Sequence, residues 1–405
     1  MNHNDIRNDF PILNQKDGLI YFDNAATTLK PQSVIDAVNR YNSLESSNIH
    51  RGDYDLSIRV SDAFEGVRKK VARFINADPN EIVFTSSATQ SLNMVNFGYG
   101  RKFLKKDDVV LVSVAEHASN LLPWFLLVKE IGIKLKYIPL TESGKLTIEN
   151  FKKAMHPNVK VVSIAHITNV MGHIVPIKEI AAIAHQYGAI IAVDGAQSVP
   201  HLKTDVKDLD VDFLSFSSHK MCGPTGVGVL YGKFELLDQL DPLMVGGGSN
   251  ARFDIHGNLM LKRTPVKFEA GTPPIGGVMG LGAAIDYLSA IGMENIMEHE
   301  RELRSYLMAA LNKLDNFKVY NHDATSGIIA LNVDGIFPQD VSVYLNSKNI
   351  AIRAGDHCAK LLVNLIGVPN TVRVSFYFYN TKEEVDKLIE AFQEITLEKC
   401  IELAI

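Results

Sequence analysis

The sequence is short of cysteine and has no excess of positive charge, and each shortage excludes a class of protein. Its 405 residues include three cysteines, Cys222, Cys358 and Cys400, and no CxxC pair. An odd, sparse set argues against a disulfide framework or a structural zinc site and favours a reducing cytoplasm. The formal net charge of -5 provides no basic field for nucleic acid. We therefore expect a cytoplasmic protein with no metal and no nucleic-acid partner.

Long hydrophobic runs are missing as well. The longest apolar stretches, such as residues 121–128, are too short to span a bilayer. The polar start, Met1 to Asp5, is unlike a secretory signal, so we expect no membrane contact. With 46% hydrophobic and 21% charged residues, the composition is typical of a globular enzyme, and the length predicts roughly two domains.

What is present is an alternation of short apolar runs and longer amphipathic ones, from about residue 78 to residue 231. This alternation predicts βαβ units and a mainly parallel sheet, hence an α/β fold. After residue 274, two helical patterns lead into a smaller α+β region, whose last helix opens on a capping box from Thr381 to Glu384. We predict a large domain over residues 21–285 and a small domain made of residues 1–20 and 286–405.

Four polar side chains follow four predicted strands of the large domain. The four residues and the apolar runs that they follow are His117 after 109–114, Asn169 after 159–165, Asp194 after 189–193 and Lys220 after 211–216. In open α/β sheets, ligands bind at the carboxyl ends of the strands. We therefore expect these four residues to form one site.

The pair of Lys220 and Asp194 indicates a cofactor. A lone lysine at a strand end usually extends to the surface, but a lysine beside a carboxylate suits pyridoxal phosphate. That cofactor needs an amine for its Schiff base and an acid to keep its ring nitrogen protonated. The small residues 85–90, before a helical run, form either a phosphate site or an ordinary helix cap. A metal site of His117, Asp194 and His219 is disfavoured, because Lys220 would add a cation beside the metal.

Several segments together resemble the class V aminotransferase family, with the pyridoxal-phosphate transferase fold of type I and a seven-stranded type of sheet. The resemblance covers nearly the whole chain, from about Tyr21 to Ile395. Within this family, the run 353–359 resembles the SufS-type (group II) cysteine desulfurases. The matching segments are 21–26, 48–52, 119–120, 194–197, 217–231, 268–273, 353–359, 373–375 and 379–381.

The resemblance implies an activity and a role for each matching residue. The activity is conversion of L-cysteine to L-alanine, with the sulfur carried as a persulfide on Cys358 towards iron-sulfur cluster assembly or other sulfur trafficking. Lys220 would form the Schiff base, and His117 would stack on the ring. The implied cofactor-binding residues are Ala88, Thr89, His117, Asp194, Gln197, Ser217, His219, Lys220 and, across a homodimer, Thr272. The implied catalytic residues are Lys220, Cys358 and His117, and the substrate-binding residues are Asn169, Arg373 and His50.

The chain departs from the family pattern at the cysteine loop. Relatives commonly have His-His-Cys there, whereas this chain has Asp356-His357-Cys358. A carboxylate that faces the sulfur would disfavour the thiolate. Relatives that pass sulfur to a zinc-bearing protein carry a histidine near the position of Gln339, so the resemblance leaves a SufE-type or a SufU-type acceptor open.

The resemblance leaves alternative functions open. A selenocysteine lyase or another class V enzyme shares the same site, although an aminotransferase would have no use for Cys358. A catalytically weak scaffold that binds a sulfur acceptor is disfavoured by the presence of Lys220, Asp194 and Arg373 together.

Overall fold

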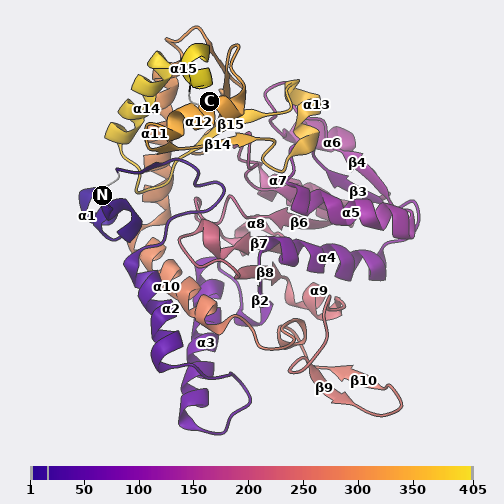
Figure 1. Cartoon of the computed structure of the whole chain (residues 1–405). Coiled ribbons are helices and arrows are strands. Elements are labelled where there is room, and N and C mark those ends of the chain that lie inside the picture. The colour runs from indigo at the N-terminus through magenta and orange to yellow at the C-terminus, as the bar shows by residue number, and fades with distance from the viewer. Residues whose placement is uncertain (1–2, 16–17, 403–405) are drawn as a thin grey trace.

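The computed structural model describes residues 3–15 and 18–402, and a seven-stranded sheet lies at its centre (Figure 1). Its strands are β2 (Ile82–Thr85), β3 (Val109–Val112), β4 (Lys134–Tyr137), β5 (Val159–Ala165), β6 (Ile190–Asp194), β7 (Phe213–Ser217) and β8 (Gly228–Gly232). They are arranged in the order β2-β8-β7-β6-β5-β3-β4. Only β8 runs against its neighbours β2 and β7, and the other pairs are parallel.

Helices cover both faces of this sheet, which is why its inner strands are largely apolar, whereas the edge strand β4 is mostly exposed. On β3, Val109 and Leu111 join the core under α3 (Asp55–Phe74), α7 (Ile177–Gln186) and α10 (Ile275–Ile291). Val110 and Val112 face the other way, into the core under α4 (Ala88–Phe103) and α5 (Ala118–Ile131). This alternation follows from the two-residue repeat of a strand. Three short helices complete this half, α6 (Ile148–Ala154), α8 (Val206–Leu209) and α9 (Phe234–Gln239).

A second, antiparallel sheet lies in the C-terminal part of the chain. Its strands, in the order β11-β12-β15-β14, are β11 (Phe317–Val319), β12 (Ile328–Val333), β15 (Thr371–Ser375) and β14 (Arg353–Gly355). One face packs on the helices α11 (Met293–Leu311), α12 (Pro338–Asn346), α14 (Lys382–Glu394) and α15 (Leu397–Glu402). Near the N-terminus, β1 (Ile20–Tyr21) pairs with β13 (Ile350–Ala351) and so joins this half.

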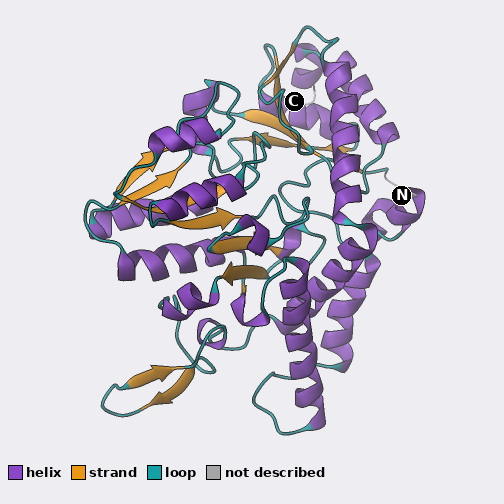
Figure 2. Cartoon of the chain, turned by 180° about the vertical axis from the view of Figure 1, so that it is seen from behind, coloured by secondary structure: helices purple, strands orange, loops and turns teal. Residues whose placement is uncertain are grey.

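The remaining elements lie outside the two sheets. The helix α2 (Gln32–Leu44) packs on α10, α1 (His3–Asn8) precedes it, and α13 (Val363–Ile366) follows the cysteine loop. The hairpin of β9 (Asn250–Phe253) and β10 (Leu259–Leu261) projects from the body of the molecule in both views (Figures 1 and 2). No single helix of the described chain is long and apolar enough to cross a membrane, and only α10 and α11, bent by 72°, reach that length and composition as a pair.

The predicted fold class is confirmed, with its mainly parallel seven-stranded sheet and a smaller α+β part. The helix α14 begins at the predicted capping box, where Thr381 and Glu384 bond each other's backbone. The first of the two helical patterns expected after residue 274 corresponds to α10, which begins directly after Pro274. The domain boundaries at residues 20 and 285 stay a prediction.

Candidate active site

A cavity of about 240 Å3 lies at the carboxyl ends of β3, β5, β6 and β7. Its lining brings together nearly all the predicted site residues from segments far apart in the chain. These are Ala88, Thr89, His117, Asn169, Asp194, Gln197, Ser217, His219, Lys220, Cys358 and Arg373. A larger cleft of about 820 Å3, between α2, α3 and α10, is lined by none of the candidate residues.

Lys220 and Asp194 both line this cavity. Asp194 is the last residue of β6, and Lys220 lies in the 3-10 turn that follows β7, so the pairing of these two strands brings the residues together. Burial lowers the pKa of the Lys220 amine to about 8, although Asp194 acts in the opposite direction. A larger fraction of this amine is therefore neutral near pH 7 than in an ordinary lysine, and only the neutral amine is a nucleophile.

His117 caps α5 and faces the same cavity. Its Nδ1 accepts the backbone N–H of Ser119 at 3.1 Å, which leaves the proton of the neutral ring on Nε2. Burial lowers its pKa, and Asp194 partly offsets this effect. The neighbouring Glu116 is fully buried and accepts hydrogen bonds from Ser113, Asn120 and the backbone of Ala165. The ring is thus fixed in position at the start of a helix.

The start of α4 forms another wall of the cavity. Ser87 caps this helix by accepting the N–H of Gln90, and Ser217 Oγ accepts the N–H of Ala88 at 2.7 Å. Thr89 Oγ1 bonds Ser119 Oγ at 2.8 Å, which ties α4 to α5. A helix start leaves backbone N–H groups and the positive end of the helix dipole facing the cavity, an arrangement that suits a phosphate.

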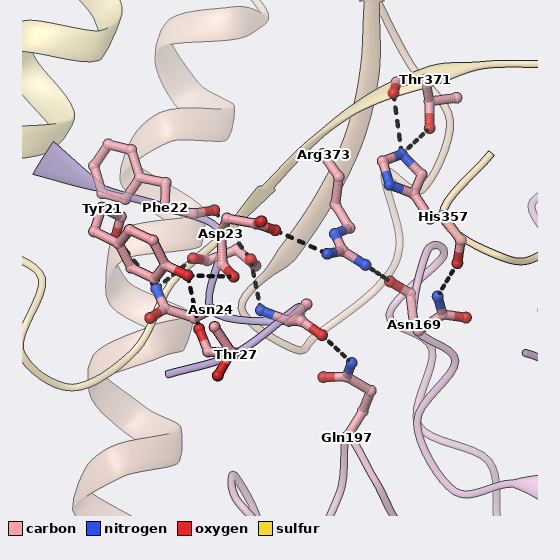
Figure 3. A network of polar contacts seen from close by, with 12 residues as sticks. Tyr21, Phe22, Asp23, Asn24, Thr27, Asn169, Gln197, His357, Thr371 and Arg373 are labelled. Carbon is pink, nitrogen blue, oxygen red and sulfur yellow. Dashed lines mark hydrogen bonds and ion pairs between the residues drawn. The ribbon is translucent and has the colours of Figure 1, made fainter. Parts of the chain in front are cut away.

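Arg373 of β15 also lines the cavity, and Figure 3 shows its side chain between Asp23 and Asn169. On β15, Val372 and Val374 face the core of the small sheet, so the alternation turns Arg373 towards the cavity. Its guanidinium donates to Asp23 Oδ1 and to the carbonyl of Asn169, both at 3.0 Å. Burial lowers its pKa, and Asp23 acts against that effect.

Arg353 also lines the cavity, and sequence reasoning did not assign it a role. It pairs with Arg373 across β14 and β15, which places two guanidinium groups on one wall. The segment 353–359, which resembles the cysteine desulfurases, begins with Arg353, so the sequence already contained an indication of its role.

Cys358 is exposed and lies at the mouth of the cavity. Its carbonyl accepts the N–H of Ala118 at 2.8 Å, next to His117. The preceding His357 is buried, and its Nε2 bonds both Oγ1 and the carbonyl of Thr371 at 3.0 Å (Figure 3). The other two cysteines, Cys222 and Cys400, are buried, and burial raises the pKa of the Cys222 thiol to about 12.

Two predicted residues, Thr272 and His50, do not line the cavity of their own chain. Thr272 is exposed in the loop before α10 and accepts a long bond of 3.5 Å from Asn48. His50 is exposed as well and lies 3.3 Å from Glu65. Both belong to loops outside the large sheet.

Comparison with known proteins identifies the family of this chain. The profile described as Aminotransferase class-V matches residues 20–388. The chain belongs to the class V aminotransferase family. Among its members, a protein from Haloferax volcanii named cysteine desulfurase is 42% identical over 405 residues, which cover 95% of each chain.

Solved structures of the same family have the same architecture. A cysteine desulfurase from Thermococcus onnurineus is 38% identical, with a TM-score of 0.92 over 96% of this chain and 97% of that one. The cysteine desulfurase CsdA from Escherichia coli is 35% identical, with a TM-score of 0.91 over 100% of this chain and 99% of that one.

The cofactor of this family, pyridoxal 5'-phosphate, fits the residues present. Two buried cavity atoms, Gln197 Oε1 and Asn169 Oδ1, have no hydrogen-bond partner among the described residues, so they are available to a ligand. The buried amine of Lys220 and the carboxylate of Asp194 are the two groups that this cofactor requires. The expected cofactor is thereby supported by the chemistry of the site as well as by the family.

Proposed function

We propose that this chain is a SufS-type cysteine desulfurase, which converts L-cysteine to L-alanine and retains the sulfur as a persulfide on Cys358. One observation carries the proposal. An exposed cysteine lies at the mouth of a cavity whose other walls present the Lys220 amine and the Asp194 carboxylate. A related transaminase would need the cavity but not a thiol at its mouth.

We infer the cofactor-binding roles from the family resemblance, and the positions of these residues around the cavity support them. Lys220 Nζ would hold pyridoxal phosphate covalently, and Asp194 would bind its ring nitrogen. When bound, this cofactor supplies an electron sink for the substrate carbons. The remaining cofactor-binding residues are Ala88, Thr89, His117, Gln197, Ser217 and His219, together with Thr272 of a second copy of the chain.

Substrate binding depends on Arg373 and Asn169. The Arg373 guanidinium is oriented by Asp23 and by the Asn169 carbonyl, and its Nε has no partner among the described residues. A planar guanidinium matches a carboxylate with two parallel hydrogen bonds, so Arg373 would bind the carboxylate of cysteine. His50 of a second copy would complete this subsite.

Sulfur transfer requires a thiolate at Cys358. Its Sγ attacks the sulfur of the bound cysteine, a new S–S bond forms, and the C–S bond of the substrate breaks. The substrate carbon takes up a proton, which Lys220 Nζ would deliver, and L-alanine leaves. One thiol and one cysteine thus become one persulfide and one alanine, without an external oxidant or reductant. Cys222 and Cys400 are buried and cannot replace Cys358.

The partners and location remain part of this proposal. The chain would form a homodimer, because Thr272 and His50 are exposed and lie outside their own cavity. A cytoplasmic acceptor of the SufE or SufU type would take the sulfur from Cys358 to iron-sulfur cluster assembly or another pathway. Selenocysteine lyase is the second candidate, because selenocysteine would fit the same cavity.

The test is to incubate the loaded protein with L-cysteine and to identify the products by mass. We expect alanine and one additional sulfur on Cys358. A Cys358→Ser variant should bind cofactor and cysteine but form almost no alanine and no persulfide. A persulfide on Cys222 or Cys400 would contradict the assignment, and a much faster reaction with selenocysteine would favour the second candidate.

A further inference from the structure

The loop that carries Cys358 has an unusual backbone. His357 and Cys358 have φ of 50° and 58°, so two consecutive residues with side chains adopt the left-handed conformation that favours glycine. Such a conformation is retained only where surrounding contacts hold it. The contacts of this loop therefore show what keeps the thiol in place.

Most of these contacts fix the ends of the turn. Asn169 Nδ2 donates to the carbonyl of His357 at 2.8 Å, and the ring of His357 bonds Thr371. The carbonyl of Cys358 is held by the N–H of Ala118 at 2.8 Å. None of these contacts involves the N–H of Cys358 itself.

Asp356 makes that remaining contact. Its Oδ1 accepts the N–H of Cys358 at 2.9 Å, which closes a turn between a side chain and the backbone two residues on. Its other oxygen, Oδ2, lies 4.0 Å from Lys360 Nζ. The carboxylate thus accepts a hydrogen bond from the backbone through one oxygen and has an exposed cation near the other.

We propose that Asp356 is a positioning residue, whose carboxylate oxygen holds the left-handed turn that presents Cys358 to the cavity. Its contribution comes from the hydrogen bond and not from the negative charge. This inference rests on the proposed function for its catalytic consequence, but the hydrogen bond itself can be tested without turnover.

The experiment compares Asp356→Asn with Asp356→Ala. Asparagine keeps an oxygen that can accept the Cys358 N–H but removes the charge, whereas alanine removes both. Hydrogen exchange of the peptide that contains residues 356–362 should be unchanged in Asp356→Asn and faster in Asp356→Ala. Single-turnover persulfide formation should stay within about twofold of wild type in Asp356→Asn and fall about tenfold or more in Asp356→Ala, because small misplacements of reacting atoms are costly.

Two controls separate position from charge and from folding. Asp78 accepts the N–H of Asn80 at 2.9 Å, in the same two-residue turn far from the cavity, so Asp78→Ala should change neither readout. The pH profile of Cys358 alkylation by iodoacetamide should coincide in wild type and Asp356→Asn. Retained cofactor absorbance would show that each variant is folded.

Several results would overturn the proposal. If Asp356→Asn and Asp356→Ala both move the alkylation profile to lower pH by the same amount, the charge of Asp356 is what matters. If Asp356→Ala exchanges hydrogen as slowly as wild type, the turn does not depend on this side chain. If Asp356→Ala does not fold, the test rests on Asp356→Asn. Faster hydrogen exchange of its 356–362 peptide than in wild type would contradict the proposal, and an equal rate would support it. Failure of the proposed function would look different, since wild type would then form no persulfide while the exchange difference remained.

Discussion

At the scale of single residues, burial suits Lys220 to the covalent attachment of the cofactor that we propose. It lines the cavity, and burial lowers the pKa of its amine to about 8. Attachment of added pyridoxal phosphate to the cofactor-free protein should therefore slow about tenfold for each pH unit below 8 and level off above it, because the neutral amine reacts. The cofactor absorbance would follow this reaction over time.

Removal of the same amine gives a second readout. Lys220→Ala should lose turnover by at least about a hundredfold, and borohydride should no longer fix cofactor to the protein. Peptide mapping of the reduced wild-type protein checks the position. An adduct on any other lysine would show that Lys220 is not the attachment site.

Arg373 is a second residue whose role depends on shape. Its guanidinium bonds Asp23 and the Asn169 carbonyl in two directions, and a lysine ammonium has no planar fork with which to do so. Arg373→Lys should raise KM for cysteine about tenfold or more, since charged hydrogen bonds contribute about 1.5–3 kcal/mol. The cofactor spectrum should not change. An unaltered KM would remove Arg373 from the substrate subsite.

At the scale of elements, the caps of the helices determine where the chain turns. Thr381 Oγ1 accepts the N–H of Glu384, and the Glu384 carboxylate accepts the N–H of Thr381, which begins α14 beside the small sheet. Thr381→Ala should destabilise the protein by about 1 kcal/mol, whereas Thr381→Ser keeps the hydroxyl and should cost much less. Thermal unfolding of both variants measures the difference. Equal midpoints for alanine and serine would show that the cap contributes nothing.

Strand periodicity decides which side chains reach the cavity. On β15, Val372 and Val374 are buried in the small core, so Arg373 between them must face the opposite side. A shift of β15 by one residue would exchange these faces and remove the guanidinium from the site. The register of β15 with β12 and β14 is therefore as important to the proposed function as the arginine itself.

At the scale of the whole molecule, the proposed function includes a site that a second copy of the chain completes. Thr272 and His50 are exposed, and the hairpin β9–β10 carries Phe253 and Ile255, which are 71% and 96% exposed. Apolar side chains grouped at a surface favour association. Sedimentation at assay concentrations should find a dimer. An active monomer would contradict the homodimer and the role of Thr272.

A mixed dimer would test the shared site directly. Lys220→Ala disables its own cavity, and Thr272→Ala would weaken the cavity of the other copy. When the two variants are mixed after partial unfolding, dimers form in which one cavity has both defects and the other has neither. Recovery of activity above that of either variant is the expected result, and its absence would indicate that Thr272 does not act between copies.

The sequence alone predicted the mainly parallel sheet and four polar residues at the ends of its strands, and the other candidate site residues came from the family resemblance. Buried parallel strands must be apolar, so the runs that became β5 and β6 could be recognised, and polar residues at their ends could be assigned to one edge. The roles of Cys358 and Arg373 came from resemblance to a family, because neither residue has a local pattern that reveals its chemistry.

Only the tertiary structure decided which groups face one another. Arg353 joins the cavity through its pairing with Arg373, and Asp356 faces the N–H of Cys358, because these relations depend on strand register and on a left-handed turn. Sequence spacing predicts neither of these two relations, because the direction of a side chain in a loop depends on contacts with residues that are remote in the chain. The residue types could therefore be read from the sequence, whereas their orientation required the fold.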